Sequence, residues 1–115
     1  MKAFHLSCAA ALCVTSMACA GGIAPSKELV PEATALLKSE IAAGNFTGYD
    51  CFKNEALIDP RVWRSVPATT KENITTTVAV VCYGEGQGYE ATIKDARSGQ
   101  RLATFSYGRY EVHPQ

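Results

Sequence analysis

Two periods of hydrophobic and polar residues run along this chain, and the change of period separates helices from strands. Four apolar residues have the spacing i, i+3, i+4 and i+8 of one helical face: Ala33, Leu36, Leu37 and Ile41. Pro31 suits the first turn of such a helix, where a missing N–H costs nothing, and Gly44-Asn45 is a common ending. Glu40 lies at the edge of the stripe, where we expect solvent near the helix end to reach it. The pattern predicts an amphipathic helix that covers a core.

The segment from Thr70 to Cys82 supports two interpretations. Its apolar residues follow the spacing of a helical face, and Thr69 with Glu72 matches the capping box that begins many helices. Residues 75–81 are rich in β-branched side chains, which favour a strand instead. The cap signal and the apolar face together favour the helix, and the strand remains the alternative.

A β-hairpin is predicted after the glycine-rich joint 84–88. Residues 89–94 alternate apolar and polar side chains, residues 95–100 contain turn-forming Asp and Gly, and residues 101–107 return. Residues 109–112 then continue as an edge strand if the preceding glycine forms a bulge.

The register of this hairpin is open on the sequence alone. One register pairs Ile93 with Leu102, and the other pairs Asp95 with Arg101 and Ala91 with Phe105. They turn opposite faces of the second strand inward, because a shift of one residue reverses every side chain. Either register gives an α+β fold, with two helices packed on a small antiparallel sheet and one disulfide.

The first 20 residues have the pattern of a secretory signal peptide. Lys2 provides the positive start, residues 3–14 are mostly apolar, and Ala18-Cys19-Ala20 is a small-residue cleavage site. The apolar run is too short to span a bilayer. We therefore expect an exported protein, periplasmic or secreted, in which a flexible tail (21–28) leads into one domain (29–112) and a short C-terminal tail (113–115).

Cys19 supports an alternative prediction for where the protein is located. A bacterial lipoprotein signal also ends at a cysteine, although here the aliphatic residue usual three positions earlier is replaced by Ser16. Lipidation of Cys19 would anchor the domain to the outer membrane, and only then would a membrane surface be a partner.

Cleavage leaves two cysteines, Cys51 and Cys82, and two cysteines in an exported domain usually pair. The bridge would close a loop of 32 residues, counting both ends. The chain-entropy model assigns such a loop about 3.5–4 kcal/mol of stabilisation.

Charge and candidate chemistry exclude several classes of function. Removal of Lys2 with the signal leaves ten basic against 11 acidic residues, and no basic run interleaved with aromatic residues suggests nucleic acid. His113 is the one histidine of the mature chain, and it stands two residues from the C-terminus. No group of side chains has metal-ligand spacing. We therefore expect no catalytic residue, no metal and no cofactor.

Part of the chain resembles a loose group of small exported bacterial domains of unknown function. The residues that carry the resemblance are Trp63, Thr70-Lys71-Glu72, Cys82 and the run from Ile93 to Ala103, and it covers about the last half of the chain. The resemblance implies a bacterial source and no particular activity.

The sequence does not specify a function, but it favours a non-enzymatic exported module that contacts another, unknown protein. The candidate contact residues are Trp63, Tyr107 and Tyr110, which would have to form one exposed apolar patch. Trp63 is expected to be buried, and it would be a binding anchor only if it were exposed.

Two alternatives remain. One is a small hydrolase that uses carboxylates, for which Asp50, Glu55 and Asp59 or the pair Glu85 and Glu90 are candidates. The other, an inhibitor of a foreign hydrolase, is a special case of the interaction module.

Overall fold

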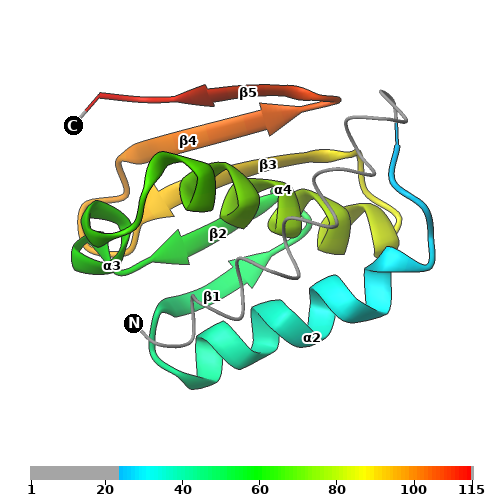
Figure 1. Cartoon of the computed structure of the whole chain (residues 1–115), viewed down its shortest axis with the longest axis horizontal. Coiled ribbons are helices and arrows are strands. Elements are labelled where there is room, and N and C mark those ends of the chain that lie inside the picture. The colour runs from blue at the N-terminus through cyan, green and yellow to red at the C-terminus, as the bar shows by residue number, and fades with distance from the viewer. Residues whose placement is uncertain (1–23, 115) are drawn as a thin grey trace.

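The computed structural model of the chain describes residues 24–114, which form a five-stranded sheet with helices packed against one face (Figure 1). The α+β class is confirmed. The helices and strands have these bounds: α2 (Leu29–Ala42), β1 (Phe46–Asp50), β2 (Glu55–Ile58), α3 (Pro60–Ser65), α4 (Ala68–Gly84), β3 (Glu90–Asp95), β4 (Arg101–Ser106) and β5 (Arg109–Val112).

The strands lie in the order β1-β2-β3-β4-β5, and the sheet is mixed rather than purely antiparallel. Neighbouring strands run antiparallel except β2 and β3, which are parallel. The exception arises because α3 and α4 carry the chain from the end of β2 back to the start of β3, the crossover that parallel strands require. The β1–β2 hairpin was not among the elements predicted, so the sheet is larger than the one expected.

The helical interpretation of residues 70–82 is confirmed, and the strand alternative is wrong. Three consecutive buried threonines are accommodated because each hydroxyl donates to the backbone carbonyl four residues earlier, at distances of 2.7–2.9 Å. The capping box is also wrong, since the helix begins at Ala68 after Pro67 and without a side-chain cap. Thr69 and Glu72 therefore lie within the helix. Burial against the sheet and α2 outweighs the β propensity of these threonines.

Helix α2 packs through the predicted stripe, with Ala33 and Leu37 fully buried. Glu40 is buried as well, at 3% exposure, and not relieved by solvent. The Asn45 side chain donates a 2.7 Å hydrogen bond to its carboxylate from just beyond the helix end. Along the part of the chain that the structure describes, no helix is both long and apolar enough to span a membrane.

The hairpin of β3 and β4 has the register that pairs Ala91 with Phe105. The register shifts after Ile93, so Arg101 pairs with Lys94 and not with Asp95 as this register predicted. The shift allows both Leu102 and Ala103 to be buried. The Asp95 carboxylate closes the turn by accepting from the backbone N–H groups of the second and third residues after it. These hydrogen bonds lower the pKa of Asp95.

The predicted disulfide between Cys51 and Cys82 is present, with 5.0 Å between the Cα atoms. It joins the residue after β1 to the last turns of α4. Both cysteines are buried, so the bridge is part of the core and fixes the β1–β2 turn to the main helix.

Candidate functional site

Three connections meet at one end of the sheet. Strands β1 and β4 end there, and β2, β3 and β5 begin there, because of the strand directions. We call this the loop end and define it as residues 51–54, 85–89 and 107–108. It lies at the right of Figure 1, where α4 also ends and α2 begins.

The β1–β2 turn presents Phe52 to solvent on a fixed backbone. The Phe52 side chain is 91% exposed, although its neighbour Cys51 is buried in the disulfide. The Asp50 carboxylate accepts the Phe52 N–H at 2.9 Å, and Asn54 takes the left-handed conformation with φ of 53°. A large apolar side chain therefore projects from a turn that is held on both sides.

Asn54 ties this turn to the glycine-rich joint. Its side-chain amide donates to the carbonyl oxygens of Gly88 and Glu90, at 3.0 and 2.9 Å, and its own carbonyl accepts the Thr92 N–H at 2.8 Å. These bonds cross from β2 to β3 where the parallel pair begins. The position of Phe52 is consequently fixed relative to the joint and not only within its own hairpin.

The third connection is a two-residue turn with positive φ at both positions, 47° at Tyr107 and 93° at Gly108. Such turns normally use Asn or Gly at the first position, because a larger side chain is strained there. Tyr107 is 52% exposed, its N–H donates to the Tyr89 carbonyl, and a Cβ at Gly88 would lie 2.9 Å from its hydroxyl oxygen. The tyrosine thus lies over the joint despite an unfavourable backbone.

An aromatic cluster supports the loop end from below. Tyr89 is completely buried, and its ring makes edge contacts with Phe105, Tyr83 and Tyr107 at centroid separations of 4.9, 6.0 and 6.4 Å. Tyr49 also contacts this end of the sheet, through a hydrogen bond to the Glu85 carboxylate. Burial, the charge of Glu85 and this hydrogen bond raise the pKa of the Tyr49 phenol. The exposed residues of the loop end therefore pack on a cluster of buried and half-buried aromatic rings.

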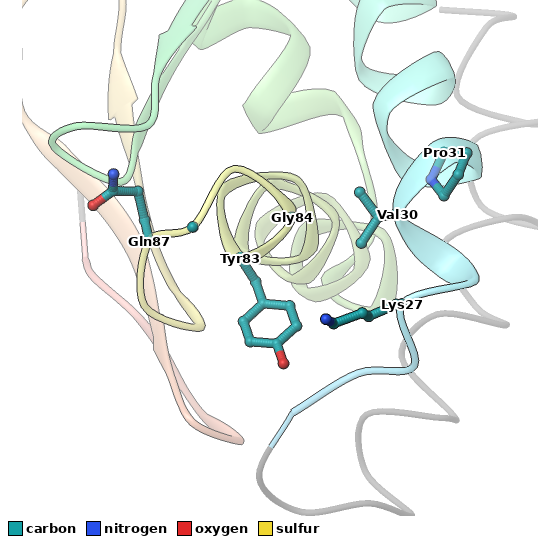
Figure 2. A pocket seen from close by; sticks show the side chains of 7 residues that line it. Lys27, Val30, Pro31, Tyr83, Gly84 and Gln87 are labelled. Carbon is teal, nitrogen blue, oxygen red and sulfur yellow. The ribbon is translucent and has the colours of Figure 1, made fainter.

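A pocket of about 500 Å³ opens beside the loop end, between the start of α2 and the end of α4. Figure 2 shows the Lys27 and Tyr83 side chains side by side, with the Gln87 side chain beyond Tyr83 and its amide pointing away from both. Val30 and Pro31 supply an apolar wall. An ammonium group and a phenol beside an apolar wall suit the carboxylate or amide oxygens of a peptide.

Gly84 allows Val30 of α2 to lie against the end of α4, where both residues line this pocket. A Cβ on Gly84 would overlap Cγ1 of Val30 and lie 3.0 Å from its Cγ2. The missing side chain therefore allows α2 to approach the end of α4 closely.

The predicted contact residues do not form one patch. Trp63 is 1% exposed, as expected, and Lys71 lies over its ring with Nζ 5.5 Å from the centroid. Tyr110 is half-buried on β5, where burial and the nearby charge of Glu72 raise its pKa to about 12. Tyr107 alone lies in the loop end. Cys19 is outside the described residues.

Sequence reasoning missed Phe52 and Tyr83. No sequence pattern singled out Phe52, and the signal that could have done so is the turn-forming pair Asp50 and Asn54, with three residues between them. Tyr83 has no comparable signal, because its exposure depends on how α2 crosses α4.

The carboxylates offered as catalytic candidates have structural partners. Glu55 forms a 2.8 Å ion pair with Lys94, and Asp59 caps α3 and pairs with Arg61. Asp50 and Glu55 do line one shallow pocket of about 340 Å³ on the β1–β2 hairpin. Between residues 24 and 114, no three His, Cys, Asp or Glu side chains are grouped so as to hold a metal ion.

Comparisons of this chain with protein-family models, curated proteins and solved structures found no significant match.

Proposed function

We propose that this protein is a non-enzymatic exported interaction module that contacts another protein through its loop end. The observation that carries the proposal is the exposure of Phe52 on a turn held by a disulfide, an Asx hydrogen bond and the Asn54 amide. Binding energy at protein interfaces is concentrated in a few aromatic anchors. An anchor that is already ordered loses little conformational entropy on binding.

The neighbouring features fit the same role. Burial of an exposed phenylalanine contributes about 1.5–3 kcal/mol, and Tyr107 adds a second aromatic contact across Gly88. The pocket with Lys27 and Tyr83 would accept an acidic or carbonyl-bearing group of the partner. Export follows from the signal-peptide pattern of residues 1–20, and an oxidising compartment suits the disulfide. An inhibitor of a foreign hydrolase is the case in which the partner is an enzyme.

The second candidate is a small carboxylate-dependent hydrolase, favoured by the single pocket that Asp50 and Glu55 share. The hydrogen bond to Phe52 N–H and the ion pair with Lys94 give these two acids structural roles. They are therefore weaker candidates for catalysis than the aromatic residues are for binding.

The proposal is tested by affinity capture from envelope and culture-medium extracts with matched variants. Phe52→Ser removes the anchor, and Tyr107→Asn removes the second ring while retaining a residue suited to positive φ. Arg97→Ala changes an exposed residue in the turn at the opposite end of the sheet. We expect a partner that is captured by the wild type and Arg97→Ala but lost from the two aromatic variants. Equal capture by all four proteins would contradict the assignment of the loop end.

A further inference from the structure

Strand β5 leaves one edge of the sheet open. Within residues 24–114 it pairs with β4 and with no other strand. The His113 N–H donates to the Leu102 carbonyl at 2.8 Å, which fixes the alternation of hydrogen bonds along the pair. By that alternation the backbone groups of Arg109 and Glu111 point toward β4, and those of Tyr110 and Val112 point away from it.

The side chains along this open edge alternate in charge. Arg109 and Glu111 lie on one face of β5, with Tyr110 on the other face between them. Proteins usually protect an open edge with charges that repel a second strand. Arg109 and Glu111 carry opposite charges, so whether they repel a second copy of β5 depends on the register in which the two strands pair.

Only one symmetric antiparallel register matches these charges. Two copies of β5 related by a two-fold axis must pair residues whose backbone groups point outward. A register centred on Arg109 places Arg109 opposite itself, and one centred on Glu111 places two carboxylates together. The register centred on Tyr110 places Arg109 of each copy opposite Glu111 of the other, twice over.

We propose that a second copy of this chain pairs with the open edge of β5 in the register centred on Tyr110. The pairing continues the sheet across the two-fold axis and satisfies the outward N–H and C=O groups of Tyr110 in both copies. Val112, which is 56% exposed, then lies opposite Gly108, where no side chain obstructs it. The present contact between Arg109 Nε and Glu111 Oε2, at 3.8 Å on exposed side chains, is weak and is exchanged for two cross-strand pairs.

The proposed dimer shares only Gly108 with the loop end, and the anchor residue Phe52 is not part of the edge. The Phe52→Ser variant should therefore self-associate as the wild type does. Failure of self-association would leave the loop-end proposal standing, and the reverse also holds.

Charge exchange gives the sharpest test. Arg109→Glu makes both edge charges negative, and Glu111→Arg makes both positive, so each variant alone places like charges opposite each other at every position. A mixture of the two restores opposite charges throughout the same register. Both substitutions are at exposed positions, so the monomer fold is expected to be retained.

Sedimentation equilibrium of the exported form between about 10 μM and 1 mM covers the range of weak associations. We expect the wild type to dimerise in this range, and each single variant to dissociate at least about tenfold more readily. The equimolar mixture should form a one-to-one dimer. Val112→Pro removes an outward N–H without affecting the β4–β5 hydrogen bonds, and it should also be monomeric.

Wild-type protein that is monomeric throughout would overturn the proposal, as would dimers that the charge variants do not weaken. Single variants that remain monomeric when mixed would overturn the register. In that case Arg109 and Glu111 only protect the edge.

Discussion

Replacement of Gly84 by alanine tests the close approach of α2 to α4, on which the pocket depends. The new Cβ would overlap Cγ1 of Val30 and lie 3.0 and 3.2 Å from its Cγ2 and Cβ. These atoms belong to a branched, stiff side chain, which cannot move aside as the end of a lysine can. Relief of the overlap therefore requires the helices to separate.

The expected loss of stability follows from two opposing effects. Overpacking of this kind destabilises a fold by about 1–3 kcal/mol, and three contacts with a stiff side chain place Gly84→Ala in the upper half of that range. Alanine gains up to about 1 kcal/mol over glycine within a helix. The net loss is about 1–2 kcal/mol, which lowers the melting temperature of a domain of this size by roughly 4–16 °C.

The assay is urea unfolding followed by circular dichroism, with Gly48→Ala as the matched control. A Cβ on Gly48 would meet no atom within 4 Å, so this variant should differ from the wild type by less than about 0.5 kcal/mol. Val30→Ala removes the obstructing methyl groups, so the double variant should lose about 1–2 kcal/mol less than the two single variants together. A Gly84→Ala protein as stable as the wild type, with additive effects in the double variant, would refute the reasoning.

Three further predictions concern the frame of the site. Replacement of Cys51 and Cys82 by alanine should lower the free energy of unfolding by about 3–4 kcal/mol in urea titrations, because the unfolded chain is no longer constrained over the loop between them; a loss below about 1 kcal/mol would contradict this. The Tyr110 phenol should titrate near pH 12 in ultraviolet difference spectra, and since the native state holds its proton more strongly, stability should fall as the pH rises from 10 towards 12, less so in Tyr110→Phe. Asn45→Ala should destabilise the fold by about 1–3 kcal/mol in thermal unfolding, because Glu40 loses a hydrogen bond in a buried site; no change in melting temperature would disprove the importance of that bond.

Local patterns were sufficient to predict α2, α4 and the β3–β4 hairpin. In each case an apolar periodicity of adequate length agrees with a turn or end signal nearby, such as Gly44 after α2 and Asp95 in the hairpin turn. The prediction of the capping box was wrong because the helix begins at Ala68, one residue before the expected cap.

The β1–β2 hairpin was not predictable, for two physical reasons. Its strands have only five and four residues, and Gly48 interrupts the side-chain alternation of the first. Its partner β3 is parallel and more than 30 residues away, so no local signal marks the pairing. The disulfide was predictable because the expected signal cleavage would leave only two cysteines, and these are the two that pair.

The candidate site was predicted only in part. Tyr107 could be proposed because it stands beside Gly108 at the end of a predicted strand, but Trp63 and Tyr110 are held in or against the core. Phe52 was missed because an aromatic residue next to a disulfide cysteine indicates a core position. Glu40 shows the converse error, a carboxylate expected at the surface that is buried and bonded to the Asn45 amide just beyond the helix end.

The most direct test of the loop-end contact is site-specific photo-crosslinking in cells that produce the protein. A benzoylphenylalanine replaces Phe52 in one strain and Arg97, at the opposite end of the sheet, in another. The account predicts a discrete adduct of constant mass from position 52 that is absent from position 97. No adduct from position 52, or the same adducts from both positions, would contradict the claim that this end of the sheet binds a partner.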